Sequence, residues 1–129
     1  MNKKIKIVLF WSVLGVIVVL GIGYLIYDSN QPGPLDDFAT CLKDKGAVFY
    51  GAFWCPHCQN QKKMFGNSER LLPYVECSLP NGSGQNQACN DKKIEGYPTW
   101  EFADKTRETG EVPLKTLAEK TGCELPQNY

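Results

Sequence analysis

Neither sign of charge is in excess in this sequence, which has 14 lysines and arginines against 14 aspartates and glutamates. The basic residues after residue 27 are scattered, so the sequence lacks the basic patch on which nucleic-acid binding depends. Internal repeats and low-complexity tracts are also absent, which excludes a repeat architecture. With 129 residues, the chain has room for one small domain.

Histidine is nearly absent, with His57 alone, whereas cysteine is abundant for the length. Six cysteines in 129 residues are too many for a typical cytosolic protein, whose thiols are kept reduced. They favour an oxidising compartment outside the cytoplasm. There, disulfides would supplement the small core that about 95–100 soluble residues can build.

One long run without charge lies near the N-terminus. Residues 7–27 form an uncharged stretch that, as a helix, would reach about 31 Å and match the hydrocarbon thickness of a bilayer. Lysines precede it and aspartates follow it, namely Lys3, Lys4, Lys6 and then Asp28, Asp36 and Asp37. By the positive-inside rule we expect residues 1–6 in the cytoplasm, a transmembrane signal-anchor helix at 7–27, and the rest of the chain on the extracytoplasmic or periplasmic side.

A cleaved signal peptide is the alternative interpretation of this stretch. Its apolar region is usually about 7–15 residues long and ends in a small-x-small site, which Gly21-Ile22-Gly23 matches poorly. Residues 28–35 are polar and interrupted by proline and glycine, so they predict a linker. This linker reaches at most about 30 Å, so the domain at 36–129 works close to the membrane, which favours a partner within it.

The remaining pattern predicts an α/β domain. Apolar runs rich in β-forming residues indicate strands, and segments that open with aspartate or proline and close at glycine indicate helices. The expected order is a helix at 36–45 capped by Asp36 and Asp37, a strand at 47–53, a helix at 56–65, a strand at 74–77, a helix at 87–94, a hairpin at 99–102 and 106–109, and a helix at 113–122. Parallel strands with crossover helices, followed by a hairpin, make a mixed sheet covered by helices on both faces.

Two cysteines, Cys55 and Cys58, lie where the first strand gives way to a helix. Pro56 suits the first turn of that helix, so the pair can close a small disulfide with the first sulfur exposed and the second tucked into the helix. The free N–H groups and partial positive charge of the helix N-terminus stabilise the thiolate of Cys55, the predicted nucleophile, and Cys58 is expected to resolve the mixed disulfide. The pair is itself the redox group, so we expect no cofactor.

The residues around the pair are expected to tune it. His57 adds a hydrogen-bond donor or a positive charge that stabilises the reduced form, which favours oxidation of other proteins. Pro56 and Trp54 are also expected to tune the redox properties of the pair. Haem attachment requires histidine directly after the second cysteine, where Gln59 stands. Zinc bound by Cys55, Cys58, Cys77 and Cys89 is the more serious alternative, but the last two lack close spacing, so we expect no metal.

The motif Phe53-Trp54-Cys55-Pro56-His57-Cys58, followed some forty residues later by Tyr97-Pro98-Thr99, resembles the thioredoxin superfamily over residues 36–122. With Pro73-Tyr74-Val75-Glu76-Cys77 and Gly96-Tyr97-Pro98-Thr99-Trp100 added, the chain is similar to the thioredoxin-like domain associated with bacterial vitamin K epoxide reductase homologues. The resemblance implies a cis-proline at Pro98 that faces the cysteine pair, an extended substrate bound along Tyr97, Pro98 and Thr99, and a quinone-linked membrane redox partner.

The sequence departs from thioredoxin in two respects. Relatives commonly carry an acid six residues before the first cysteine to handle the proton of the second thiol, but Phe49 stands there. The strand that opens thioredoxin is also missing, so we expect a minimal fold of about four strands.

Four further cysteines are available for structural disulfides. Cys77 and Cys89 end a strand and enter the next helix with only a loop between them, so they are expected to pair, contributing roughly 2–3 kcal/mol. By elimination, Cys41 on the first helix pairs with Cys123 beyond the last. Buried free thiols, or an electron relay through Cys77 and Cys89, are the alternatives.

These features predict an enzyme, a protein thiol-disulfide oxidoreductase tethered to a membrane. It would pass a disulfide to exported protein thiols through Cys55 and Cys58 and be reoxidised by a membrane partner. The same parts would also suit a tethered reductase or isomerase. A redox-inert module that only binds peptides is the other class, which the intact cysteine pair argues against.

Overall fold

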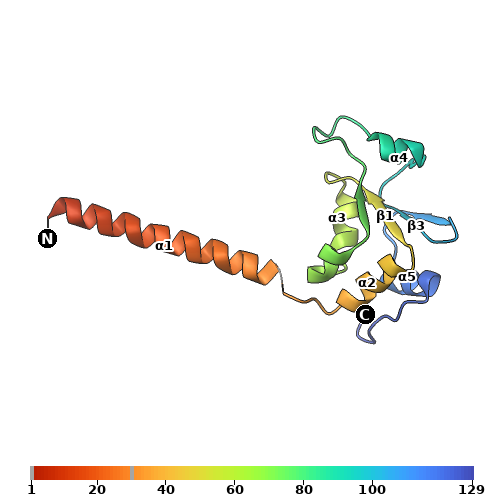
Figure 1. Cartoon of the computed structure of the whole chain (residues 1–129), viewed down its shortest axis with the longest axis horizontal. Coiled ribbons are helices and arrows are strands. Elements are labelled where there is room, and N and C mark those ends of the chain that lie inside the picture. Colours follow the sequence, from red (N-terminus) through yellow and green to blue (C-terminus); the bar gives the residue numbers. More distant parts are fainter. Residues whose placement is uncertain (1, 30) are drawn as a thin grey trace. The chain divides into compact units, whose positions relative to one another are not determined.

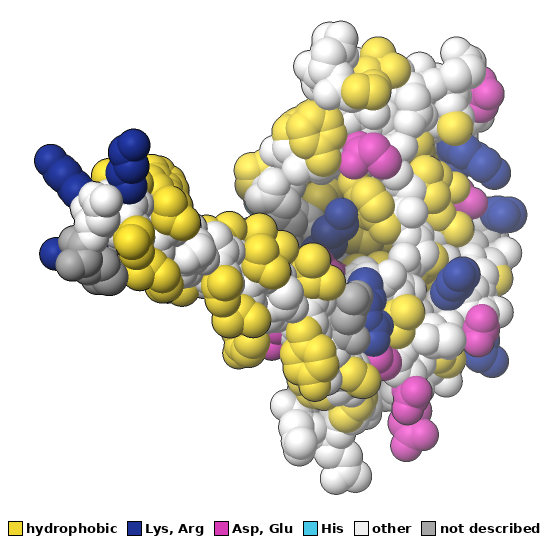
Figure 2. Space-filling view, turned by 60° about the vertical axis from the view of Figure 1, so that its left-hand side comes forward, with side chains coloured by type: hydrophobic (Ala, Val, Ile, Leu, Met, Phe, Trp, Pro, Cys, Tyr) yellow, Lys and Arg dark blue, Asp and Glu magenta, His cyan; other side chains and the backbone are white. Residues whose placement is uncertain are grey.

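The computed structural model of the chain describes residues 2–29 and 31–129, in two compact units that divide between Gln31 and Pro32. The N-terminal unit consists of helix α1 (Lys3–Ser29), which extends beyond the expected stretch at both ends. Its apolar side chains are exposed along its length, and Figure 2 shows them in yellow with lysines at one tip. The helix is long and apolar enough to cross a membrane, by length and composition.

The second unit opens with helix α2 (Asp36–Asp44), which buries Phe38, Ala39 and Leu42 on one face. The expected capping by Asp36 is wrong, because Leu35 occupies the N-cap position and Asp36 is the first helical residue. Its carboxylate instead accepts a hydrogen bond from the Gly33 N–H at 3.1 Å and pairs with Arg70 at 2.6 Å. This pair holds the pKa of Asp36 below its ordinary value.

A mixed sheet of four strands lies at the centre of the domain in the part of the chain that the structure describes. The strands are β1 (Val48–Gly51), β2 (Tyr74–Glu76), β3 (Thr99–Glu101) and β4 (Arg107–Thr109), in the spatial order β2-β1-β3-β4. Strand β1 runs parallel to β2 and antiparallel to β3, and β3 forms the predicted hairpin with β4. The predicted sheet is therefore confirmed, with strands shorter than the apolar runs suggested.

Helices cover both faces of the sheet. Successive side chains of β1 point to opposite faces, so their contacts show which helices lie on which face. Phe49 faces a core that includes residues of α2, α3 (Pro56–Lys63) and α5 (Leu114–Thr121). Tyr50 points to the other face, where it packs with Cys77, Cys89 and Ile94 around α4 (Gln87–Asp91). Figure 1 shows α4 at the opposite end of the domain from α2 and α5.

A short 3₁₀ helix, η1 (Gly66–Leu71), was not expected. Its first residue, Gly66, has φ of +52°, a conformation that favours glycine and ends the preceding helical segment. The buried hydroxyl of Ser68 then accepts a hydrogen bond from the Leu35 N–H at 3.1 Å, which joins η1 to the entrance of α2. The chain between α3 and β2 is thereby packed rather than loose.

The order of elements, the mixed sheet and the helices on both faces make up a minimal thioredoxin-like fold. Among residues 2–29 and 31–35 the structure has no strand, as the sequence predicted, and the chain passes from Leu35 directly into α2. A disulfide between Cys41 and Cys123, with an S–S distance of 2.09 Å, links α2 to the segment after α5. The first helix and the end of the domain are therefore covalently joined.

Candidate active site

The cysteine pair lies at the start of α3. Cys55 is the N-cap residue, with an extended backbone, and Pro56 is the first helical residue. The N–H of Cys58 donates to the Sγ of Cys55 at 3.4 Å, so the first sulfur occupies the place of a capping oxygen. Both cysteines are free thiols. This local geometry follows from the sequence, because proline favours the first helical turn and supplies no N–H there.

Both cysteines of the pair are buried. Cys58 is 1% exposed, as predicted for the second sulfur, but Cys55 is only 5% exposed, so the expectation of an openly exposed first residue is wrong. Cys55 belongs to the main core cluster, and the Tyr97 carbonyl of the loop before β3 lies 3.7 Å from its Sγ. Burial raises the pKa of Cys58 to about 12, although the Lys62 ammonium and a hydrogen bond with the Ala52 backbone oppose the shift.

The loop facing the thiols contains a cis peptide bond between Tyr97 and Pro98. Pro98 is buried, and the hydroxyl of Thr99 donates to the Gly96 carbonyl at 2.8 Å, which secures the loop against the sheet. The ring of Trp54 packs edge-on against Tyr97 with centroids 6.1 Å apart, and its indole N–H donates to Ser78 at 2.8 Å. The structure thus brings Tyr97 to Cys55 and Trp54 to Tyr97, whereas the hydroxyl of Thr99 contacts Gly96 and Thr109 and has no described contact with the pair.

His57 lies on the outer side of α3 with 69% of its side chain exposed. Its Nδ1 lies 2.6 Å from the Oε1 of Glu111, and Asn60 donates to the same oxygen at 3.1 Å. The hydrogen bond with His57 lowers the pKa of Glu111. Sequence reasoning did not identify Glu111, because it lies 54 residues away on the segment between β4 and α5 and belongs to no motif.

A second group missed by sequence reasoning lies behind the pair, on β2. Tyr74 packs against Phe49 with centroids 5.1 Å apart, and its hydroxyl donates to Glu76 at 2.8 Å. Burial, and then the hydrogen bond with Glu76, raise the pKa of Tyr74. In the sequence, both residues only supported the resemblance and had no predicted role, although the alternation of side chains along the strand places Tyr74 and Glu76 on the same face.

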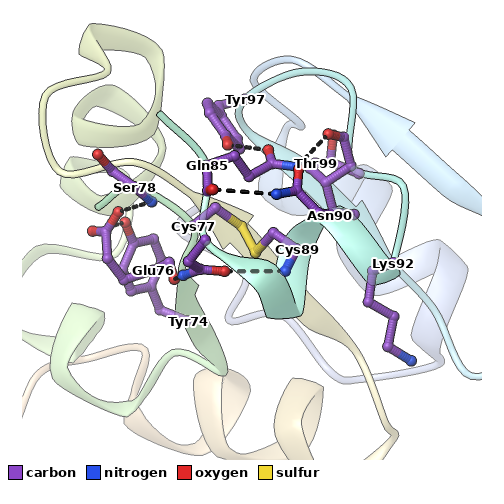
Figure 3. The surroundings of a disulfide bond; sticks show 12 residues. Tyr74, Glu76, Cys77, Ser78, Gln85, Cys89, Asn90, Lys92, Tyr97 and Thr99 are labelled. Atoms are coloured by element: carbon purple, nitrogen blue, oxygen red, sulfur yellow. Dashed lines mark hydrogen bonds between the residues drawn. A yellow bond between two sulfur atoms is a disulfide. The ribbon is translucent and has the colours of Figure 1, made fainter. Parts of the chain in front are cut away.

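The remaining two cysteines form a disulfide rather than a metal site. Cys77 and Cys89 are joined at an S–S distance of 1.98 Å, and Figure 3 shows this bond between the end of β2 and α4. The four-thiolate zinc set is therefore not assembled. Among residues 2–29 and 31–129, no group of three or more histidine, cysteine or acidic side chains is arranged to hold a metal ion.

No protein-family model matches the chain. The chain is similar to thiol-disulfide oxidoreductase LTO1 from Arabidopsis thaliana, with 48% identity over 94 residues. The match covers 69% of this chain but only 24% of that protein, so the chain spans about a quarter of its relative's length. The relative is named for the chemistry that a pair of thiols at a helix N-terminus can perform.

Proposed function

We propose that this chain is a membrane-tethered thiol-disulfide oxidoreductase that passes a disulfide to exported proteins through Cys55 and Cys58. One observation supports this most strongly: two free thiols lie at the N-terminus of α3, with a backbone carbonyl beside the first sulfur. The helix N-terminus stabilises the charge on sulfur that disulfide exchange requires. The similarity to a thiol-disulfide oxidoreductase agrees with this chemistry.

The proposed reaction begins with the oxidised pair. A substrate thiolate attacks the Sγ of Cys55, the Cys55–Cys58 bond breaks, and Cys58 leaves and takes up a proton. A second substrate thiolate then attacks the substrate sulfur of the mixed disulfide and releases Cys55 as a thiolate. The substrate loses two electrons and gains a disulfide, and the enzyme is left with two reduced cysteines.

The loop at Tyr97, Pro98 and Thr99 is the proposed binding site for the substrate chain. The backbone of Tyr97, ahead of β3, can pair with an extended peptide without reading its sequence. Phe53 and Trp54, which are 51% and 50% exposed, provide an apolar rim next to Cys55. Protein thiols with apolar neighbours are therefore the proposed substrates.

Reoxidation is assigned to a quinone-linked membrane partner similar to bacterial vitamin K epoxide reductase homologues. In this proposal α1 is a signal-anchor, residues 1–6 are cytoplasmic because of their lysines, and the domain is extracytoplasmic. The short connection after α1 would hold the thiols near the membrane surface. The partner accepts the two electrons and two protons that each substrate disulfide leaves on the enzyme.

The reduction potential of the pair tests the direction of electron flow. We expect the full chain in detergent micelles, equilibrated against glutathione, to give a value between about −200 and −100 mV. His57→Ala should lower it by on the order of 30 mV, a tenfold change in the equilibrium constant, because the reduced form loses a stabilising group. A parental value at or below about −270 mV, with the pair reduced in cells, would instead identify a tethered reductase.

A further inference from the structure

Cys58 needs a proton acceptor, and the usual position for one is occupied by an apolar ring. Phe49 is fully buried and packs between Tyr74 and Trp100, with ring centroids 5.1 and 4.9 Å away. Because burial raises the pKa of Cys58 to about 12, the thiol does not ionise unaided near neutral pH. Each cycle of disulfide exchange nevertheless requires this thiol to lose and regain a proton.

Strand β2 brings a tyrosine next to the buried sulfur. A Cβ added to Gly51 would lie 2.9 Å from the Sγ of Cys58 and 2.8 Å from Cε2 of Tyr74. The Tyr74 hydroxyl lies 3.4 Å from the same point. The thiol and the phenol therefore share the space over Gly51, which is open only because this residue has no side chain.

The phenol is in turn bound to a carboxylate that is held in place. The Tyr74 hydroxyl donates to one oxygen of Glu76 at 2.8 Å. The other oxygen accepts the backbone N–H groups of Ser78 at 2.8 Å and Phe53 at 3.2 Å. Figure 3 shows Tyr74, Glu76 and Ser78 side by side at the end of β2. Glu76 is half-buried and thus also within reach of water.

We propose that Glu76, acting through the hydroxyl of Tyr74, accepts the proton of Cys58 when that thiol attacks a mixed disulfide, and returns it when Cys58 is the leaving group. The Cys58 S–H bond breaks as its proton passes to the Tyr74 oxygen, while the Tyr74 O–H proton passes to the Glu76 carboxylate. The thiolate then attacks the Sγ of Cys55 and releases the partner as a thiolate. The assignment rests on the proposed thiol-disulfide exchange but not on its direction.

Other charged and titratable groups lie around the proposed route of the proton from Cys58 through Tyr74 to Glu76. The Lys62 ammonium of α3 lies 3.5 Å from the centroid of the Tyr74 ring, where it stabilises the thiolate at Cys58. Cys55, at the N-terminus of α3, interacts with Tyr74. Tyr97, in the loop before β3, interacts with Glu76 and Cys58. Lys62 cannot serve as the acceptor in its charged form, because an ammonium has no lone pair. Glu76 is a carboxylate and accepts a hydrogen bond from Tyr74, so it can serve as the acceptor.

The two thiols can be followed separately with a chromogenic disulfide. Reduced full chain in detergent micelles, mixed with dithiobis-nitrobenzoate, releases one coloured thiolate when Cys55 attacks and a second when Cys58 resolves the mixed disulfide. Near neutral pH, Glu76→Gln and Tyr74→Phe should slow the second release on the order of tenfold or more and leave the first unchanged. Glu119→Gln, an exposed carboxylate on α5, is the matched control and should change neither.

The pH profile separates a proton acceptor from a structural residue. As pH rises towards the pKa of Cys58, hydroxide removes the proton directly, so both variants should regain the parental rate. An unchanged second release in both variants, or equal slowing of both releases at every pH, would overturn the assignment. Tyr74→Phe removes one oxygen from a half-buried ring and decides the question if Glu76→Gln fails to fold. Absence of either release from the parent would contradict the proposed function itself.

Discussion

Gly51 is the residue on which the arrangement behind the cysteine pair depends. Its backbone pairs with Glu76 in the register of β1 and β2, and its carbonyl accepts the Cys77 N–H at 2.7 Å. The space above it holds the Cys58 sulfur and the edge of the Tyr74 ring. Any side chain here would have to displace one of the two groups that the proposed proton transfer brings together.

Gly51→Ala should therefore destabilise the domain and slow the step that depends on Cys58. The new Cβ would lie within 2.8 Å of the Tyr74 ring and 2.9 Å of Cys58, so overpacking should cost about 1–3 kcal/mol. For a domain of this size, each kcal/mol lowers Tm by roughly 4–8 °C. Thermal unfolding of the full chain by near-ultraviolet circular dichroism, with dithiobis-nitrobenzoate kinetics, would measure both effects.

Gly84→Ala is the matched control for this substitution. Its Cβ would meet only the Leu79 side chain, at an ordinary contact distance of 3.8 Å. We expect its Tm and its kinetics to stay close to those of the parent. Equal stability of the two variants would show that the space over Gly51 is not tightly filled.

At the scale of elements, the hairpin of β3 and β4 carries a nearly buried ion pair. Glu101 on β3 is 5% exposed, and Arg107 opposite it on β4 donates two hydrogen bonds to one carboxylate oxygen at 2.6 and 2.8 Å. Arg107 also donates to the Lys92 and Lys93 carbonyls beyond α4. Burial would raise the pKa of Glu101, but the hydrogen bonds and charge of Arg107 outweigh it and leave the pKa below its ordinary value of 4.5.

This shift predicts a pH dependence of stability. A carboxyl group with a lowered pKa in the folded state stabilises the fold above its unfolded pKa, and this contribution is lost as pH falls through the folded pKa. Glu101→Gln should lower stability at neutral pH by about 1–3 kcal/mol, because Arg107 loses its charged partner. The difference in Tm between parent and variant should then narrow below pH 4.5, the ordinary value for this group. A constant difference across that range would rule out the pair as its cause.

Elements whose signals are local were predictable from the sequence. The short break between residues 102 and 106 indicated the turn of the hairpin, and Pro56 indicated the start of α3, because the conformational preferences that mark a turn or a helix start act within a few positions. Helix η1 was missed because its stability comes from Ser68 binding the distant backbone of Leu35. No periodic apolar pattern accompanies that contact.

The residues of the candidate site also fall into those with a local sequence signal and those without one. Cys55 and Cys58 were identified because their spacing is itself the motif. Glu111 and Tyr74 were not, since each acts on a residue of the cysteine helix from another element, and the approach depends on the sheet register and on Gly51. Only the folded chain brings such residues together, and a single sequence carries no signal of the pairing.

At the scale of the whole molecule, the second unit, Pro32–Tyr129, is small for an independent fold. Its described residues form a four-stranded sheet without the opening strand of thioredoxin. Small domains bury a lower fraction of their surface on folding and commonly rely on cross-links. The bond between Cys41 and Cys123 spans 82 residues of sequence, nearly the whole unit, whereas that between Cys77 and Cys89 spans 12.

Loss of the long-range cross-link should therefore destabilise the domain more than loss of the short one. Chain-entropy arguments assign about 4.5 kcal/mol to a loop of this length and about 3 kcal/mol to the short loop, because the longer loop restricts the unfolded chain more. Paired substitutions, Cys41→Ala with Cys123→Ala and Cys77→Ala with Cys89→Ala, keep Cys55 and Cys58 intact. Each pair serves as the control for the other. Thermal unfolding of the full chains in detergent micelles should give the lower Tm for the first pair. The opposite order would mean that packing of Cys77 and Cys89 beneath Tyr50, rather than chain entropy, dominates their contribution.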